Sequence, residues 1–289
     1  MSYKYYLKDI MKFIDFPFKI EKTFLKKDYH VHSHDFSELV IVTSGSAKHI
    51  IDEEVFDISA GDVYVLKEGT AHGIKEVESL EIWNIMYYSE MINEVNYDIK
   101  KLPGFQALFF IEPLYRKTHS FKSRLSLSYE KLAYVKDALN QMLTEYSTGI
   151  DGYQTAIWAY FMTLVVFLSR EYSKIDTPLA GQLFKLAQSV SYIEKNYTKP
   201  ISVKELSEMA FLSERHYNRV FKLNYGTTPI NYIIELRIRH ACALLSRSTM
   251  PVIRIALESG FNDSNYFSRL FKMKMGLTPA EFRNQSFQV

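Results

Sequence analysis

In the last third of the chain, apolar residues recur at the three- and four-residue steps that are typical of amphipathic helices. A short helix is predicted over residues 203–210, and a second begins after Ser213, whose hydroxyl group suits an N-cap. A longer helix is predicted from Pro229 to about Ser246, with the proline in its first turn. Two short helices joined by a tight turn are the pattern of a helix-turn-helix.

This helical stretch contains one pattern twice, 50 residues apart. The first copy reads Arg219-Val220-Phe221-Lys222, then Gly226, Thr228 and Pro229, and the second reads Arg269-Leu270-Phe271-Lys272, then Gly276, Thr278 and Pro279. A fixed internal period indicates a duplicated supersecondary unit. The second copy is predicted to have a short helix over residues 255–259, a turn at Gly260-Phe261 and Asp263 as its N-cap. Upstream of the caps the offset falls to 49, so the second turn should be one residue longer.

The second helix of each copy is predicted to turn a polar, basic face outward. Tyr217, Val220 and Phe221 face inward in the first copy, and Tyr266 or Phe267 takes the first of these positions in the second. The candidate DNA-binding residues are Arg215, Asn218, Arg219, Lys222, Ser264, Asn265, Ser268, Arg269 and Lys272. Arginine reads guanine and asparagine reads adenine, whereas lysine more often holds phosphate. The connecting helix would be about 27 Å long, which suits two adjacent major-groove segments about 34 Å apart.

Between residue 21 and about residue 90, the pattern changes to short alternating stretches. Strands are predicted over residues 38–43, 49–52, 54–58, 63–66 and 80–88, with turns at Gly45, Gly61 and Gly69. Short strands with regular turn signals favour a sandwich or a barrel. The segment before them is predicted to be an arm, or alternatively an edge strand.

The middle of the chain is predicted to be irregular over residues 100–122 and then helical. Helices are expected over about 128–147 and 152–173, and the first has its apolar positions at Leu132, Val135, Leu139, Met142 and Leu143. A linker containing Pro178 is expected after them.

Charge separates the two ends of the chain. The net charge of +2 combines a C-terminal part, from Gln182 onward, that has 15 Lys and Arg against 8 Asp and Glu, with an acidic remainder. A basic module suits phosphate groups. The single cysteine, Cys242, excludes an internal disulfide and fits a reducing cytoplasm. The N-terminal residues are too polar for a secretory signal, and the most apolar run, residues 156–168, is too short for a membrane span.

The duplicated region resembles the AraC/XylS family of bacterial transcription regulators. The resemblance is carried by Leu206-Ser207, the Arg219–Lys222 stretch, Leu236-Arg237-Ile238-Arg239-His240-Ala241, Ile255-Ala256, Gly260-Phe261, residues 266–272 and Gly276-Leu277-Thr278-Pro279. It implies a DNA-binding protein that forms a homodimer through two helices behind a barrel, although a packed hairpin without dimerisation stays open. An interaction module that has lost DNA binding is disfavoured by the outward basic residues.

A second resemblance lies in the β-rich part. The spacing His32-x-His34-x3-Glu38-x6-Gly45 resembles the first cupin motif without its leading glycine. The spacing Gly61-x5-Lys67-x-Gly69-x2-His72 resembles the second motif, with Lys67 where proline is usual. Cupins are small jelly-roll barrels, and in metal-binding cupins these three histidines and the glutamate hold a metal.

The candidate effector-binding residues are His32, His34, Glu38, His72 and Trp83. His32, His34 and Glu38 share strand parity and are expected on one face of a single strand. Imidazole and carboxylate groups suit a transition metal, but the resemblance to sugar-responsive regulators favours a small effector without a metal. Structural hydrogen bonding by the cluster, and core packing by Trp83, remain alternatives.

Together these observations predict an α+β multidomain protein, and they predict no cofactor. The expected divisions are an arm (1–20), a cupin-type effector domain (21–122), a helical hairpin for dimerisation (123–173), a linker (174–182) and two helix-turn-helix motifs joined by a long helix (183–289). The predicted function is cytoplasmic, ligand-responsive regulation of transcription, with a DNA operator and a sugar or sugar derivative as partners, and RNA polymerase if the protein is an activator. A metal-dependent cupin enzyme fused to a DNA-binding module is the alternative.

Overall fold

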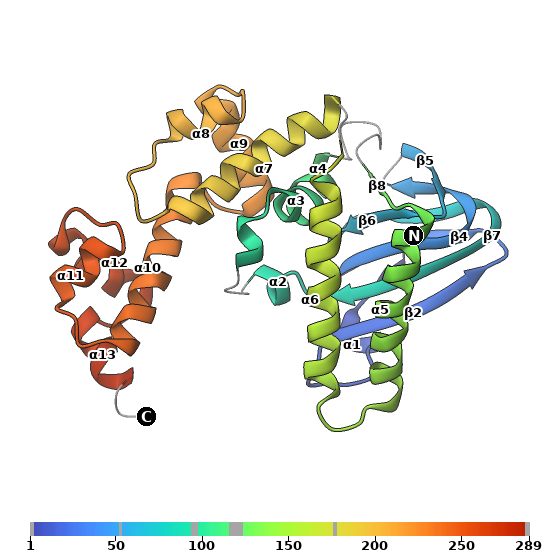
Figure 1. Cartoon of the computed structure of the whole chain (residues 1–289), viewed down its shortest axis with the longest axis horizontal. Coiled ribbons are helices and arrows are strands. Elements are labelled where there is room, and N and C mark those ends of the chain that lie inside the picture. Colours follow the sequence, from blue (N-terminus) through green and yellow to red (C-terminus); the bar gives the residue numbers. More distant parts are fainter. Residues whose placement is uncertain (1–2, 52–53, 94–97, 116–123, 176–177, 287–289) are drawn as a thin grey trace. The chain divides into compact units, whose positions relative to one another are not determined.

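A computed structural model describes residues 3–51, 54–93, 98–115, 124–175 and 178–286 (Figure 1). The chain divides into two compact units, Met1–Ala187 and Gln188–Val289. The finer predicted divisions stay predictions, and the predicted boundary at residues 122 and 123 lies outside the described residues.

The first unit is built on an eight-stranded sheet. Its strands are β1 (Tyr3–Tyr5), β2 (Phe18–Leu25), β3 (Tyr29–His34), β4 (Ser37–Ile51), β5 (Glu54–Ser59), β6 (Asp62–Leu66), β7 (His72–Tyr87) and β8 (Leu125–Ser126). The strand order is β1-β3-β7-β4-β6-β8, while β2 also pairs with β7 and β5 also pairs with β4. The long strands β4 and β7 therefore form an antiparallel pair at the centre of this sheet, as Figure 1 shows.

Two of the strands are longer than the sequence pattern predicts. Residues 38–43 and the described residues 49–51 of the predicted strand 49–52 belong to one strand, β4, and β7 begins at His72 rather than at Leu80. The pairing of β4 with β7 shifts register three times between Val42 and Lys48. Bulges at these shifts accommodate the residues around Gly45, where the sequence pattern predicts a turn. Gly45 lies there with φ of +76°, where an added Cβ atom would be 2.2 Å from the carbonyl oxygen of Ser79.

Side chains alternate across this sheet and create two different interfaces. One face forms a core cluster of Val40, Val42, Ala47, Ile51, Phe56, Ile58, Tyr64, Leu66, Ile74, Leu80 and Ile82. The other face packs on helix α6 (Tyr153–Tyr172), where the ring of Phe161 lies 5.2 Å from that of Tyr87 and 5.4 Å from that of Phe18. Strand β6 and the first seven residues of β4 are buried on both sides, whereas β5 alternates between exposed and buried residues.

Helices α5 (Tyr129–Thr148) and α6 form the predicted hairpin and pack against each other. The four apolar residues Leu132, Val135, Leu139 and Met142 of α5 are buried within this unit. The segment predicted to be irregular, residues 100–122, is described only to residue 115, and this part forms short helical turns: η1 (Asp98–Lys101), α3 (Pro103–Gln106), η2 (Ala107–Ile111) and α4 (Glu112–Tyr115). Pro103 begins one of these turns, a position that proline favours because it needs no amide donor. The remaining short helices are α1 (Leu7–Ile10) and α2 (Glu90–Asn93).

The second half of the predicted linker, residues 174–182, is helical. Helix α7 runs from Pro178 to Asn196, so the chain is helical from the residue that read as a breaker. Proline breaks the interior of a helix, but its fixed φ angle suits the first turn.

The second unit is helical and contains the duplicated motif. Its helices after α7 are α8 (Val203–Met209), α9 (Glu214–Tyr225), α10 (Pro229–Arg247), α11 (Val252–Glu258), α12 (Ser264–Met275) and α13 (Pro279–Ser286). The turn between α8 and α9 comprises residues 210–213 and that between α11 and α12 comprises residues 259–263, so the predicted extra residue is confirmed. The predicted caps are also confirmed: the Ser213 hydroxyl accepts from the amide of His216, and the Asp263 carboxylate accepts from the amides of Asn265 and Tyr266.

The inward face of α12 resolves the choice between two aromatic residues. Phe267 is fully buried, whereas Tyr266 is 44% exposed. Tyr217, Val220 and Phe221 are buried in α9, as their spacing predicts. Among the described helices, none combines the length and apolar character that crossing a bilayer requires.

Candidate functional site: a buried pocket and two exposed helices

The sheet of the first unit encloses a cavity of about 180 Å³. Its wall comes from β2, β3, β4, β6 and β7, and the N-terminal arm adds Tyr5 and Ile10. The apolar part of the wall includes Phe36, Val40 and Ile82, so the polar groups of the cavity lie in a largely apolar surrounding.

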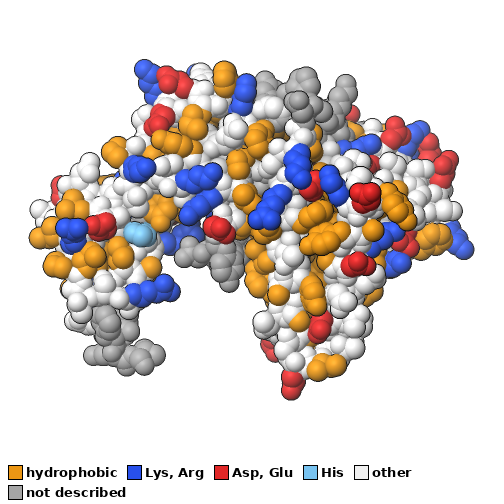
Figure 2. All heavy atoms as spheres, in the orientation of Figure 1, with side chains coloured by type: hydrophobic (Ala, Val, Ile, Leu, Met, Phe, Trp, Pro, Cys, Tyr) orange, Lys and Arg blue, Asp and Glu red, His pale blue; other side chains and the backbone are white. Residues whose placement is uncertain are grey.

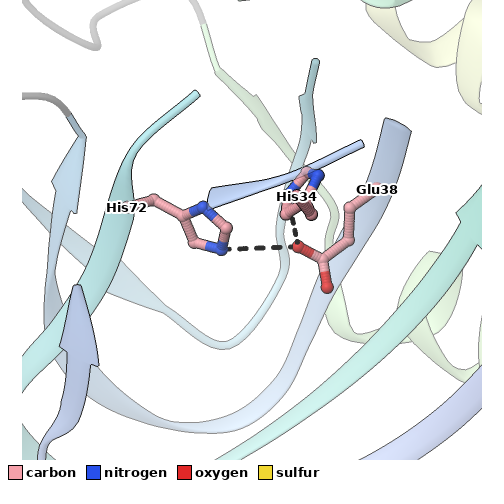
Figure 3. Close-up of side chains that lie close together, drawn as sticks. All are labelled: His34, Glu38 and His72. Atoms are coloured by element: carbon pink, nitrogen blue, oxygen red, sulfur yellow. Dashed lines mark ion pairs between the residues drawn. The ribbon is translucent and has the colours of Figure 1, made fainter. Parts of the chain in front are cut away.

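Three polar side chains converge inside this cavity (Figure 3). His34 ends β3, Glu38 is the second residue of β4, and His72 begins β7. Glu38 Oε2 lies 3.6 Å from His34 Nε2 and 3.5 Å from His72 Nε2. All three residues are buried, and one ligand atom from each lies within 4.8 Å of the others.

The backbone decides which nitrogen of each imidazole faces the carboxylate. His34 Nδ1 lies 2.5 Å from the carbonyl oxygen of Phe36, and His72 Nδ1 lies 3.3 Å from that of Thr70. Because a carbonyl oxygen only accepts hydrogen bonds, each Nδ1 atom carries the proton, and in a neutral ring the Nε2 atom is then an acceptor. Within the described residues, His34 Nε2 has no hydrogen-bond partner.

Burial and charge set the protonation of this cluster. Burial lowers the pKa of His72 to about 3, in spite of the nearby Glu38 carboxylate. Burial by itself raises the pKa of the Glu38 carboxyl, but the interaction with His34 outweighs burial, so this pKa lies below its ordinary value. At neutral pH the cavity therefore presents an ionised carboxylate and an uncharged His72 ring whose acceptor atoms face each other. Such an arrangement suits a ligand that supplies donors or positive charge.

Two of the sequence-predicted residues lie outside this group. His32 lines the cavity and its ring centroid is 4.2 Å from that of His72, but its Nδ1 atom contacts the His30 carbonyl oxygen and the residue is half-buried. Trp83 does not line the cavity, because in β7 it shares parity with Tyr87 and so faces the helical side of the sheet. The expectation that one strand carries His32, His34 and Glu38 is also wrong, since the chain bends between β3 and β4.

Sequence reasoning missed several residues of the cavity wall. Asn84 stands one position from Trp83 on β7, and its side-chain oxygen is buried without a hydrogen-bond partner in the described part of the chain. A lone amide within an apolar strand was the available signal. Tyr5 was not predicted either: its hydroxyl lies 3.3 Å from that of Tyr29, and β1 pairs in parallel with β3. The arm thus closes one side of the cavity.

The second candidate site is the outward face of α9 and α12. Arg215, Arg219 and Lys222 are exposed in α9, and Asn265, Arg269 and Lys272 are exposed in α12. Asn218, Ser264 and Ser268 are half-buried at the edge of these faces. Both helices therefore present an arginine and a lysine at equivalent positions to solvent.

Comparisons with known proteins agree with both halves of this architecture. Residues 206–285 match the model of a helix-turn-helix domain, and residues 21–82 match that of a cupin domain. The chain is 29% identical to the HTH-type transcriptional activator RhaR of Salmonella schwarzengrund over 260 residues, which cover 89% of this chain and 88% of that protein. It is 24% identical over 269 residues to the activator RhaR of Mannheimia succiniciproducens, covering 93% and 92% of the two chains. These matches support an AraC-family transcription regulator with an N-terminal cupin domain.

Solved structures also match this AraC-family chain. A transcriptional regulator with an AraC-type DNA-binding domain from Chromobacterium violaceum is 34% identical, with a TM-score of 0.34, and the match covers 37% of this chain and 96% of that one. The relatives are transcription regulators, which supports a regulator rather than the enzyme fusion that the cupin motifs left open.

The recognition faces of this AraC-family regulator contain local contacts that the sequence did not reveal. The Asn218 amide donates to the carbonyl oxygen of Glu214 at 2.9 Å, and the Ser268 hydroxyl donates to that of Ser264 at 2.8 Å. A base contact by either side chain would have to replace this contact with the helix backbone. His216 was not predicted as a candidate, yet it is exposed on α9 with its Nε2 atom 3.4 Å from Arg219 Nη2.

Proposed function

We propose that this protein is a ligand-responsive transcription activator that reads DNA with α9 and α12 and binds a small effector in the cupin cavity. The convergence of Glu38, His34 and His72 in one cavity carries the ligand part of this proposal. The equivalent exposed arginines of the two helices support the DNA part. The activator part follows the relatives, whose names describe transcriptional activators, and it implies RNA polymerase as a partner.

DNA recognition divides between two kinds of contact. Arg219 and Arg269 donate paired hydrogen bonds to guanine in the major groove, whereas Lys222 and Lys272 hold phosphate groups. Arg215 and Asn218 complete the first face, and the second face is completed by Ser264, Asn265 and Ser268. The partner is a double-stranded DNA operator with two adjacent segments, one for each helix.

The effector is a molecule rich in hydroxyl groups, a sugar or a sugar derivative. The ionised Glu38 and the Nε2 atom of neutral His72 are acceptors that face each other 3.5 Å apart. Hydroxyl groups placed between them donate to both, which relieves an otherwise unfavourable contact in an apolar cavity. Asn84 offers a further acceptor on the same wall.

Thermal unfolding across a panel of sugars tests this proposal. A sugar that binds raises the melting temperature of the parent, because a ligand of the folded state stabilises it by mass action. Glu38→Gln should abolish the shift, whereas Glu54→Gln, an exposed glutamate of β5 in the same sheet, should retain it. An equal shift in Glu38→Gln and the parent would exclude the cluster as the effector site.

The same cluster supports a second candidate, a divalent transition metal ion. Two imidazoles and one carboxylate are ligands that such metals prefer, and the Nδ1 contacts orient both Nε2 atoms as metal-binding histidines require. Chelation would lower the melting temperature of a protein that contains a metal, and adding zinc or manganese would restore it. A melting temperature that is indifferent to both treatments leaves the sugar as the ligand.

We further propose that the protein acts as a homodimer through the hairpin of α5 and α6. Hydrophobic side chains lie over this hairpin in Figure 2, and Tyr134 and Tyr160 are 49% and 36% exposed. Leu132 and Leu139 are buried within the protomer, so they do not serve as interface probes. Tyr134→Glu with Tyr160→Glu should yield a folded monomer in light scattering. A parent that is monomeric at micromolar concentration, with and without effector, would exclude the dimer.

A further inference from the structure

Arg237 of α10 binds the segment that follows α7. Its Nε atom donates to the carbonyl oxygen of Tyr197 at 2.6 Å, and its Nη2 atom donates to that of Lys199 at 2.8 Å. The same guanidinium lies over the ring of Phe261, 5.8 Å from its centroid, in the turn of the second helix-turn-helix. One side chain on the connecting helix thus joins residues 197–199 to the second copy.

Gly260 brings the second turn directly against this segment. Its φ angle is +89°, and an added Cβ atom would lie 2.6 Å from the carbonyl oxygen of Thr198 and 2.9 Å from Arg237 Nε. Two backbone segments that approach this closely leave no room for a side chain. The turn of the second copy is therefore held at a fixed distance from residues 197–199.

The last turns of α7, just before this segment, are attached to the first copy and to α10. The Ser189 and Tyr217 hydroxyl groups lie 2.9 Å apart in the interior, and the Tyr192 hydroxyl donates to Glu205 at 2.7 Å. The Tyr232 hydroxyl of α10 donates to the buried Glu194 carboxylate. The end of α7 is thus fixed to α8, α9 and α10, and the 197–199 segment continues from it.

From these contacts we infer that Arg237 is a positioning residue that sets the orientation of α12 relative to α9, and so the spacing of the two DNA segments they read. This role rests on the proposed reading of DNA by both helices. Arginine suits it because its planar fork donates to two carbonyl groups while stacking on a ring, which lysine cannot do. Carbonyl oxygens at the end of a helix carry partial negative charge and favour a cation.

Binding to a duplex that the parent selects from a random-sequence library tests the role. The probes are the intact duplex, two versions with one half scrambled, and one with a base pair inserted between the halves. Arg237→Gln should bind the intact duplex on the order of tenfold more weakly. Without Arg237, α12 is no longer held at the distance from α9 that the two halves require, so part of the affinity gained by binding both halves at once is lost. Its affinity for the half-scrambled duplexes should equal that of the parent. Inserting the base pair should reduce its affinity by a smaller factor than it reduces the affinity of the parent.

Arg239→Gln is the matched control, because it removes the same charge from an exposed position two residues along the same helix. Any loss it causes should be equal on all four duplexes. An Arg237→Gln protein that loses the same factor on every duplex, or that binds the intact duplex like the parent, would overturn the positioning role. A parent that selects no sequence would instead overturn the proposed reading of DNA, and the positioning role with it.

Folding is monitored separately by circular dichroism. If Arg237→Gln melts below the temperature of the binding assay, Phe261→Leu replaces it, since leucine keeps the turn apolar but removes the ring beneath the guanidinium. The same dependence on spacing is expected from this variant. A folded Phe261→Leu protein whose penalty for the inserted base pair equals that of the parent would also contradict the inference.

Discussion

Helices α9 and α12 have equivalent buried faces and different exposed faces. The buried pairs are Tyr217 with Phe267, Val220 with Leu270, and Phe221 with Phe271. The exposed faces share Arg219 with Arg269 and Lys222 with Lys272, but Arg215 corresponds to Asn265, His216 to Tyr266, and Asn218 to Ser268. The two helices thus share a buried scaffold and differ in their exposed side chains. If both read DNA as proposed, one chain should recognise two dissimilar DNA segments.

The turns before these helices differ in a second way. Phe211 and Gly260 both have positive φ angles, of +55° and +89°. Phe211 is 74% exposed, so a side chain has room there in spite of its left-handed backbone. Gly260 has no such room, because the Thr198 carbonyl group lies against it. The first turn therefore has room for a side chain at its left-handed residue, whereas packing around the second turn leaves room only for glycine.

The largest effect is expected from the buried rings. Phe221→Ala and Phe271→Ala should each lower the free energy of unfolding of the helical unit by about 3–5 kcal/mol, through lost burial and a residual cavity. Leu223→Ala and Met273→Ala, at exposed positions of the same helices, should change it by less than about 0.5 kcal/mol.

The chain offers an internal reference for this measurement. Its two tryptophans, Trp83 and Trp158, both lie in the first unit. In urea, the circular dichroism transition should move in Phe221→Ala and Phe271→Ala, while the tryptophan fluorescence midpoint should stay at that of the parent. A joint displacement of both signals would show that the two units unfold together.

The next largest effect concerns the shared arginines. Arg219→Ala and Arg269→Ala should each weaken operator binding by about 1–3 kcal/mol and relax the choice of base in one segment only. Comparing the sequences that each variant selects from a random duplex library measures this. If both variants relax the same segment, the two helices do not read separate sites, and if neither loses affinity, the assigned faces are wrong.

The turns should respond in opposite directions. Phe211→Gly should raise the free energy of unfolding by up to about 1 kcal/mol, since relief of a left-handed conformation exceeds the conformational entropy that glycine loses. Gly260→Ala should lower it by at least about 1 kcal/mol, because its conformation is incompatible and a carbonyl group blocks the new methyl group. Thermal and urea melts of the pair decide the matter, and equal signs would contradict the contrast between the turns.

The smallest effect belongs to the lysines. Lys222→Ala and Lys272→Ala should each weaken binding to all duplexes alike and reduce the slope of log affinity against log salt by about 1. Titrations at several salt concentrations measure this slope. A loss confined to one DNA segment would show that the lysine reads a base instead.

The pocket shows where prediction from sequence stopped. The spacing of the cupin motifs identified His34, Glu38 and His72, which the fold brings together from three strands. Trp83 packs in the core, the alternative that the sequence left open, because the parity of β7 and the helices behind the sheet decide which face a residue takes. The motif spacing gave no sign of Tyr5, which reaches the cavity through the pairing of β1 with β3.

The sequence by itself determined the duplicated helices, their caps at Ser213 and Asp263 and the inward face of α9, because helix periodicity and capping depend on neighbours within a few residues. Only the tertiary structure decided the contents of the cavity and the attachment of Arg237 to residues 197–199, since both depend on contacts between distant segments. The same distinction explains Pro178, whose ring ends a helix or begins one according to the backbone around it. Local sequence determines where helices and strands form, whereas packing between distant segments determines which residues come together in a site.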